Sequence, residues 1–439
     1  MIMKKSDNCC VSAALATATC ALLGTGPHGA VQAQEEHAWE FDSALLYYGE
    51  DKGRVQDISL NVLARRNFLD DKVLSLGLAV DTLTGSTPLG ATPLDGPQTV
   101  TSPSGKKTYS MPPNEIPLDP SFLDTRVAFT ASWEQPFARL NTLNAGISFS
   151  DEYDYTHAGV NLTLSRDFNK RNTTASLGLS AARDDWSPVG GTPDPLSPML
   201  DVGDLSNRGP DDSKDIFDVV LGVTQVFSRN LVGQLNYSYS NSSGYLNDPY
   251  KILSVVDPVT GDPIPPTPPS GIEGPSHIYL FEGRPDDRTK HSLYGKLKYY
   301  LSGKVLDVSY RYMTDDWEID SHTLDARLRF PLSDRSYLEP HLRYYTQTHA
   351  DFYRVSLVNG EPLPQYASAD YRLGEFDAIT AGIKYGWQSR SGHDLSVRLE
   401  YYMQDGDAPA EQIVGRQADQ DLYPDLDAII FQFSYSFGL

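Results

Sequence analysis

The residues with the clearest chemical potential are charged side chains at alternate positions of several segments in the second half of the chain. Because neighbouring residues of a β-strand point to opposite faces, this spacing places the charges on one common face. Cations along a water-filled interior would create an electric field that orients and selects polar solutes. Alternatively, they would pair with carboxylates and fill the interior as a salt-bridge network. The set consists of eight cations, Lys296, Lys298, Arg311, Arg327, Arg329, Arg343, Lys384 and Arg398, and four carboxylates, Asp307, Asp325, Glu339 and Glu400.

Other kinds of chemistry have less support in the sequence. Metal ligands at compact spacing are absent, because no histidine after residue 33 has a second histidine two or four positions away. Carboxylates in residues 148–155 and 257–262, with Asp248, supply oxygen atoms that suit a hard divalent cation, although a solvated acidic loop is the simpler interpretation. The scattered histidines are His37, His157, His277, His291, His322, His341, His349 and His393.

Enzymatic activity is not expected. A hydrolase needs a nucleophile, a histidine and an orienting group that converge in space. The chain contains no Gly-x-Ser-x-Gly, His-Glu-x-x-His or Walker sequence. We therefore expect no catalytic residue and no cofactor, and the question of bound metals stays open.

The segments that carry these charges alternate apolar and polar residues, which is typical of β-strands with one apolar face. Residues 427–439 (DAIIFQFSYSFGL) show the pattern most clearly and resemble the C-terminal strand of bacterial outer-membrane barrels, with Leu439 in place of a terminal aromatic residue. Sixteen such strands are predicted. They begin near Trp39, Gln56, Lys72, Leu123, Thr142, Tyr155, Thr173, Lys214, Leu231, Arg288, Lys304, Ser321, Tyr337, Tyr371, Gly392 and Leu426.

The lengths of the connections point to a barrel. Single-chain barrels of the outer membrane have an even number of antiparallel strands, short periplasmic turns and long extracellular loops. Here every long link follows an odd-numbered strand and every link after an even-numbered strand is short. The long links are residues 86–122, 187–213, 246–287, 355–370 and 406–425. The short links lie around residues 69–71, 138–139, 169–172, 228–230, 302–303, 333–335 and 389–391.

Aromatic residues near strand ends fit a girdle at the lipid headgroups. The expected girdle comprises Trp39, Tyr47, Tyr48, Trp133, Trp186, Trp317 and Trp387. The Pro-rich stretch 265–269 should be stiff and extended. Its loop either folds into the mouth of the barrel as a constriction or stands in solvent.

The start of the chain predicts a secretory signal peptide at residues 1–33, with two lysines, an apolar run and a Val-x-Ala site, followed by the barrel at residues 34–439. All three cysteines, Cys9, Cys10 and Cys20, fall within that segment, so the mature chain would have no disulfide. No other stretch is long and apolar enough for a membrane helix. The formal net charge of −22 argues against nucleic acid as a partner.

Several long segments resemble an uncharacterised family of proteobacterial outer-membrane barrels, the domain of unknown function three-five-seven-zero. The resemblance implies a location and an architecture, but no substrate, reaction or catalytic residue; a link to a periplasmic redox or maturation system is only hinted at. The segments are residues 81–88 (DTLTGSTP), 98–105 (QTVTSPSG), 118–126 (LDPSFLDTR), 148–155 (SFSDEYDY), 188–191 (PVGG), 284–301 (RPDDRTKHSLYGKLKYYL), 340–353 and 368–386.

Together these observations predict an all-β transmembrane barrel in the bacterial outer membrane, where it would contact lipids and lipopolysaccharide. We expect porin-like, passive passage of small polar solutes along the basic wall. The alternative is a barrel closed by its loops that serves as an envelope scaffold or as the export or maturation partner of a periplasmic protein. The sequence leaves the solute and the oligomeric state open.

Overall fold

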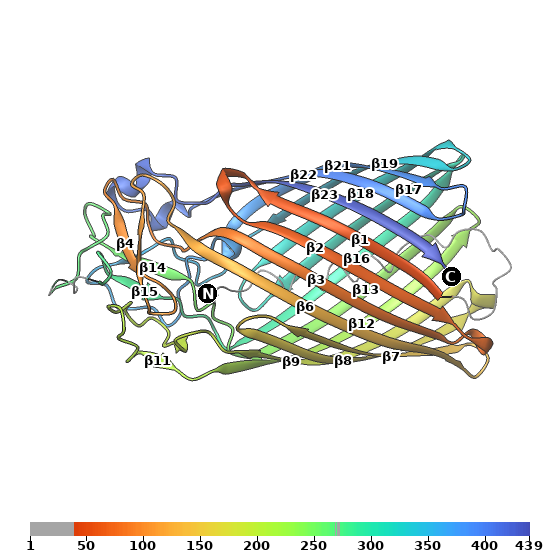
Figure 1. The fold of residues 1–439 in the computed structure, drawn as a ribbon, viewed down its shortest axis with the longest axis horizontal. Coiled ribbons are helices and arrows are strands. Elements are labelled where there is room, and N and C mark those ends of the chain that lie inside the picture. Colours follow the sequence, from red (N-terminus) through yellow and green to blue (C-terminus); the bar gives the residue numbers. More distant parts are fainter. Residues whose placement is uncertain (1–38, 268, 270–272) are drawn as a thin grey trace, which may run out of the picture.

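The computed structural model describes residues 39–267, 269 and 273–439. Sixteen strands form a closed antiparallel barrel in which each strand pairs with its neighbours in chain order and the last pairs with the first (Figure 1). The barrel strands are β1 (Trp39–Glu50), β2 (Gln56–Asn67), β3 (Val73–Pro88), β6 (Leu118–Phe137), β7 (Asn141–Asp151), β8 (Tyr155–Phe168), β9 (Thr173–Trp186), β12 (Asp212–Ser228), β13 (Leu231–Gly244), β16 (Asp287–Leu301), β17 (Lys304–Asp315), β18 (Asp320–Ser333), β19 (Ser336–Gln347), β21 (Glu375–Gln388), β22 (Asp394–Asp407) and β23 (Leu426–Gly438).

The predicted fold class and the number of strands are confirmed. The largest differences are at β6, which begins at Leu118 and not near Leu123, and at β21, which begins at Glu375 after a short 3₁₀ helix. The predicted signal peptide at residues 1–33 lies outside the described residues. Within the described residues, no helix is long and apolar enough to cross a membrane.

Side-chain alternation explains why this sequence closes into a barrel. Leu162 on β8, Leu235 on β13 and Leu399 on β22 point outward and are about half exposed. The residues directly before and after each leucine on its strand are polar and face the lumen. Closing the sheet leaves no strand edge unpaired, so backbone groups in the apolar band are satisfied by neighbouring strands. Trp39 and Leu439 exchange two backbone hydrogen bonds at the seam.

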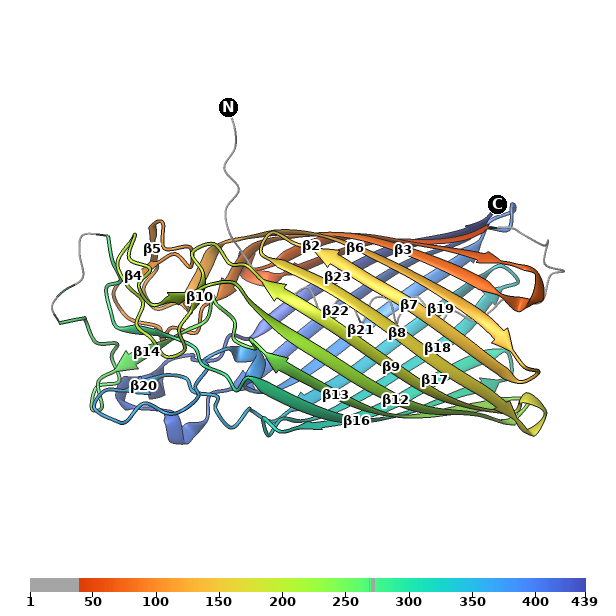
Figure 2. The ribbon, with the colours of Figure 1, turned by 90° about the horizontal axis from the view of Figure 1, so that it is seen from below.

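The links after even-numbered barrel strands are all short and lie at one end of the barrel, the turn end; the long loops lie at the other, the loop end (Figure 2). Ser302 and Gly303 close the turn between β16 and β17 with positive φ angles of 45° and 89°, the geometry that tight hairpins of right-twisted strands favour. All long links lie at the loop end, so the predicted parity of the connections is confirmed.

The long loops fold into a cap with secondary structure of its own (Figure 1). Three small sheets order the cap strands as β4-β5, β10-β11 and β15-β14-β20. The cap strands are β4 (Gln98–Thr101), β5 (Thr108–Met111), β10 (Thr192–Pro193), β11 (Arg208–Gly209), β14 (Ile252–Val256), β15 (Tyr279–Phe281) and β20 (Leu357–Val358). The short 3₁₀ helices are η1 (Asp51–Gly53), η2 (Leu69–Asp71), η3 (Asn169–Arg171), η4 (Tyr371–Leu373), η5 (Ala410–Gln412) and η6 (Gly415–Asp419).

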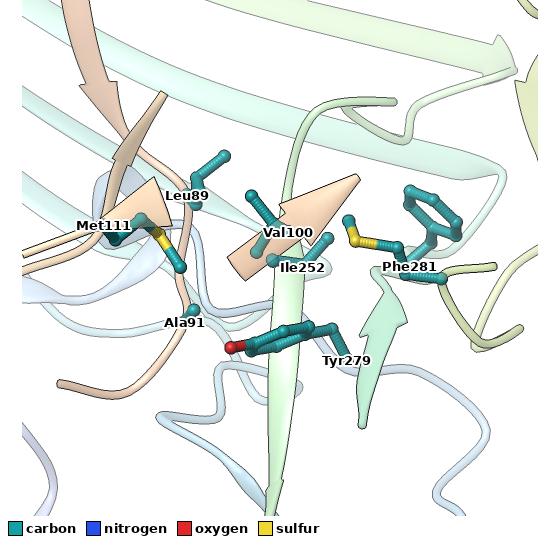
Figure 3. Packing of buried hydrophobic residues seen from close by; sticks show 8 residues of the cluster. Leu89, Ala91, Val100, Met111, Ile252, Tyr279 and Phe281 are labelled. Carbon is teal, nitrogen blue, oxygen red and sulfur yellow. The ribbon is translucent and has the colours of Figure 1, made fainter. Parts of the chain in front are cut away.

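The cap has an apolar core, which is drawn from three loops far apart in sequence. Figure 3 shows Val100 and Met111 pointing toward Ile252 and Tyr279, and these four side chains are almost fully buried. A second cluster joins Trp317 to residues of the loop 348–374, such as Phe352. The cap is therefore a folded unit with its own core.

Two sequence expectations need correction at the loop end. Trp186 and Trp317 do not belong to an aromatic girdle, because both are buried where the cap meets the barrel. Tyr48 points inward and its hydroxyl donates to Glu50 at 2.9 Å. Tyr47 and Trp133 are exposed on the outer face, as predicted.

Candidate functional site

The lumen contains a cavity of about 650 Å³ directly beneath the cap. Its side is formed by inward residues of the barrel, and its roof by the bases of the loops 245–286 and 348–374. Leu246 and Asp248 line the cavity, so the base of the loop 245–286 covers the mouth of the barrel. Of the two arrangements that the sequence left open for this loop, its base adopts the one folded into the mouth. The Pro-rich tip is different, because Pro265 is exposed to solvent. Pro268 lies outside the described residues.

The barrel wall gives the cavity a cationic side. Alternation along β16 turns Arg288, Lys290 and Ser292 toward the lumen. Arg288 is neutralised, since its Nη2 donates to the buried Asp315 at 2.5 Å. Lys290, in contrast, lines the cavity and has no hydrogen bond or ion pair among the residues that the structure describes.

The neighbouring strand continues this surface. Arg311 on β17 donates through Nε to Ser292 Oγ at 2.8 Å, a neutral partner that leaves the guanidinium charge uncompensated. Both residues line the cavity. The wall beneath the cap therefore presents positive charge to the water inside.

Buried ion pairs hold the roof together. Arg284 Nη2 donates to Glu282 Oε2 at 3.0 Å and to Asp370 Oδ2 at 2.8 Å. Arg372 Nη2 donates to Asp370 Oδ2 at 2.5 Å and to Asp248 Oδ2 at 2.7 Å. These five residues, which we call the roof network, tie the loop 245–286 to the loop 348–374 across the lumen.

Charge compensation in the roof network is close to complete. Burial alone would raise the pKa of the Asp370 carboxyl, but the cations Arg372, Lys251 and Arg284 oppose burial and hold that pKa below its usual value. Burial lowers the pKa of Lys251, whose ammonium donates to the carbonyl oxygen of Pro88 at 2.5 Å. Asp370 is therefore the anion on which several buried cations depend.

Two carboxyls beside the cavity behave in the opposite way. Burial raises the pKa of Asp154 to about 7, although a hydrogen bond from the Tyr250 hydroxyl acts against the rise. Burial also raises the pKa of Glu152 to about 9, and the nearby Asp124 adds to the effect. These two carboxyls therefore bind protons at a higher pH than an ordinary carboxyl does, whereas the Asp370 carboxyl stays ionised.

The twelve residues singled out by the sequence all occupy inward positions of β16 to β22, as predicted. His341 joins two of their carboxylates, with 2.8 Å from Nε2 to Asp325 and 2.8 Å from Nδ1 to Glu400. The pairs that form within the set are Lys296 with Asp307 at 3.0 Å, Arg327 with Asp325 at 3.4 Å, and Arg398 with Glu400 at 3.7 Å.

Most cations of the set remain without a carboxylate partner. Arg329 stacks 3.4 Å from the centroid of the Tyr337 ring, and the Lys384 ammonium lies 6.0 Å from it. Within the described part of the chain, five cations have no ion pair: Lys298, Arg311, Arg329, Arg343 and Lys384. The structure thus combines some pairing with a wall that keeps a net positive charge.

Sequence reasoning missed the cavity and the roof network. Asp370 and Arg284 are far apart in the chain, and loop residues have no periodicity that reveals their contacts. One signal was present, because the segments 148–155, 284–301 and 368–386 that carry the family resemblance all supply residues to the cavity. No group of three or more His, Cys, Asp or Glu side chains in the described ranges is arranged to hold a metal ion.

No curated protein matches this chain. Among solved structures, it is similar to a bacterial polysaccharide outer membrane secretin, with 11% identity and a TM-score of 0.44 over 92% of this chain and 99% of that chain. It is also similar to OccK5 (OpdH) of Pseudomonas aeruginosa, with 10% identity and a TM-score of 0.40 over 93% of this chain and 100% of that chain. A mutant of the ferric enterobactin receptor PfeA of Pseudomonas aeruginosa has 10% identity and a TM-score of 0.41, over 86% of this chain and 54% of that chain.

The closed barrel with an apolar exterior and a polar lumen has the architecture of an outer-membrane β-barrel. A family described as a protein of unknown function (DUF3570) matches residues 12–437. Since this match spans nearly the whole sequence, the chain belongs to that family.

Proposed function

We propose that this protein is a passive channel of the bacterial outer membrane for small polar solutes, with a preference for anions. The observation that carries the proposal is the set of inward cations without carboxylate partners, from Lys290 and Arg311 beside the cavity to Lys298, Arg329 and Lys384 nearer the turn end. Uncompensated charge on a hydrated wall raises the local concentration of counter-ions.

The opposite wall supports the same function. Strands β7 to β9 lie across the barrel from β19 to β22 in the strand order. Toward the turn end, the inward side chains of these strands are small and polar, such as Thr163, Ser165 and Ser176. Long cations on one side therefore face small polar residues on the other, an arrangement that leaves room for water and solute between them.

The cap limits the size of what passes. Because the roof network crosses the loop-end mouth, a solute has to pass between the roof and the wall, and we expect a small single-channel conductance. The apolar outer face of the barrel would contact lipid and, on the outer leaflet, lipopolysaccharide.

Conductance of the refolded protein in planar bilayers under a salt gradient tests the proposal. We expect discrete steps and a reversal potential that indicates anion preference. The double substitution Arg327→Glu with Arg329→Glu should shift the reversal potential toward cation preference. The matched control is Arg183→Glu, which reverses a charge at an outward position of β9 and should leave selectivity unchanged. The proposal would be contradicted by a folded barrel that conducts no ions, or by a reversal potential that the double substitution leaves unchanged.

A further inference from the structure

A serine, a histidine and an aspartate meet on three neighbouring strands near the loop end of the lumen. Ser148 on β7, His157 on β8 and Asp184 on β9 all point inward. The Ser148 hydroxyl lies 2.9 Å from His157 Nε2, and His157 Nδ1 lies 2.6 Å from Asp184 Oδ1. The register explains the contact, because His157 is directly opposite Asp184 across β8 and β9.

The order of the contacts is the one that activates a serine. An ionised Asp184 only accepts hydrogen bonds, so Nδ1 of His157 donates to it, and Nε2 is left to accept the proton of the Ser148 hydroxyl. This is the tautomer in which an imidazole acts as a general base toward a hydroxyl. Asp184 itself is buried and held in place by the Tyr155 hydroxyl and by Lys214, whose Nζ lies 3.2 Å away.

The residue that faces Ser148 across the strands is a glycine. A Cβ at Gly159 would lie 2.7 Å from Ser148 Oγ and 3.2 Å from His157 Nε2, so a larger residue here would push these two side chains apart. The next inward pair toward the turn end is Gly146 with Asn161. The Asn161 amide lies over Gly146 and has no hydrogen bond among the described residues, so it is the nearest candidate donor to an oxyanion that forms at Ser148.

The three side chains lie beside the residues that line the cavity beneath the cap, and the His157 side chain is 27% exposed. Tyr155 and Lys214, which hold Asp184, both line that cavity, as does Ser180, the strand neighbour of Asn161. A volume of about 650 Å³ matches small ligands. A water-filled, cationic chamber excludes long acyl chains and favours polar substrates.

We propose that Ser148, His157 and Asp184 form an acyl-transfer site that hydrolyses small, water-soluble carboxylic esters. Ser148 Oγ attacks the ester carbonyl carbon while His157 Nε2 takes the hydroxyl proton. The imidazolium returns that proton to the departing alcohol as the C–O bond breaks, which leaves an ester on Ser148. Water then repeats the sequence with His157 as base and releases the carboxylic acid. Ser148 and His157 are the catalytic residues, and Asp184 is a positioning residue.

The sequence favoured a protein without enzymatic activity because hydrolase motifs are local. The three residues here come together only through the register of β7, β8 and β9, which no short motif records. This activity does not depend on passage of solutes through the lumen, so the two proposals stand or fall separately.

A fluorophosphonate probe and a p-nitrophenyl acetate assay on the refolded full chain test the site. We expect the probe to modify Ser148, located by peptide mass spectrometry, and ester hydrolysis to fall at least about 100-fold in Ser148→Ala and in His157→Gln. The matched control is Ser150→Ala, an inward serine opposite His157 on β7, which should retain labelling and turnover. Unlabelled Ser148, or equal hydrolysis by wild type and Ser148→Ala, would overturn the proposal.

The role of Asp184 needs a measurement that a loss of structure would not mimic. Asp184→Asn should lower kcat at least about 100-fold with little change in KM, because the amide no longer fixes the imidazole tautomer. An unchanged kcat would show that Asp184 does not position His157 for the reaction. Bilayer conductance of Ser148→Ala should equal that of wild type, which shows a folded barrel and separates failure of the hydrolase from failure of the channel.

Discussion

The barrel wall and the cap obey opposite rules of construction. In the wall, apolar side chains such as Leu162 and Leu235 face outward, the lumen is polar, and stability comes from a closed ladder of backbone hydrogen bonds. In the cap, apolar side chains such as Ile252 and Tyr279 point inward to a dry core, as in a water-soluble domain. The chain therefore combines a membrane-type barrel with a small globular unit that is made entirely of the barrel's loops.

The difference matters because the two parts can fail independently. The cap depends on side-chain packing and on the roof network, whereas the wall depends on strand pairing that runs around the whole barrel. Local opening of a region with its own contacts does not require global unfolding. Substitutions in the cap should thus change the mouth of the lumen and leave the wall intact.

The largest expected effect comes from removing the anion of the roof network. Asp370→Ala leaves Arg284 and Arg372 buried without their shared carboxylate, a type of change that costs about 4 kcal/mol. We expect protease cleavage of the loops under conditions where the wild-type cap resists, a higher conductance, and unchanged heat-modifiable migration of the barrel on gels.

Arg416→Ala is the control for that change. It removes two partly solvent-exposed ion pairs of the cap, one with Asp95 and one with Asp262, whose Oδ1 lies 2.8 Å from Arg416 Nη1; such pairs contribute little to stability. A barrel that unfolds together with the cap in Asp370→Ala would show that the two regions are not separate.

A somewhat smaller effect is expected from the apolar core of the cap. Ile252→Ala creates a cavity among fully buried side chains and should reduce cap stability by about 3 kcal/mol, measured as the urea dependence of loop cleavage. Leu162→Ala removes the same kind of side chain from the lipid face of β8 and should leave loop cleavage unchanged. Equal sensitivity of the cap to both substitutions would be inconsistent with a separate core.

Acidity should act on the cap through Asp154. Its pKa is raised from 3.8 to about 7 in the folded cap, so the stability it contributes is complete below about pH 4 and is lost as the pH rises through 7. We expect loop cleavage to accelerate between pH 5 and pH 8, and less so in Asp154→Asn. Glu152 also loses its contribution to stability as the pH rises, up to about pH 9. Loop cleavage in Asp154→Asn should therefore keep part of its dependence on pH.

Asp370 provides the contrast in that experiment. Its lowered pKa gives stability that is present above about pH 4 and is lost only in acid, so it does not contribute to the change near neutral pH. Identical pH profiles for wild type and Asp154→Asn would refute the assignment.

The smallest effect on stability is expected in the wall. Arg343→Gln removes an inward cation that has no ion pair among the described residues, and should change stability by less than about 0.5 kcal/mol. The reversal potential should nevertheless shift toward cation preference. A large loss of stability would mean that lumen charges hold the wall together and are not free to act on solutes.

The wall could be predicted from the sequence almost completely. Period-two alternation identified all sixteen strands and placed residues such as Arg327 and Glu400 in the lumen, because in a barrel the local pattern determines which face each side chain occupies. The parity of long and short links identified the loop end. Of the seven aromatic residues expected in a girdle, Tyr48, Trp186 and Trp317 were misplaced, since the loops reach over the strand ends and bury them.

The cap and both sites could not be derived in this way. Arg284 and Asp370 meet because two loops fold against each other, and nothing in the spacing of loop residues encodes such a contact. The pairing of Ser148 with His157 is intermediate, because both strands were predicted but their exact register was not. One residue of slippage would have turned either side chain to the lipid.

The pairing of β14 with β20 has a consequence for how the protein is assembled. Val255 in one loop pairs with Leu357 in another, and four barrel strands lie between those loops along the chain. Contacts at such separation form late and slowly. The cap should therefore close after the wall, and a newly inserted molecule would pass through a stage with a wide, unguarded opening. Completion of the cap would then be the step that narrows this opening.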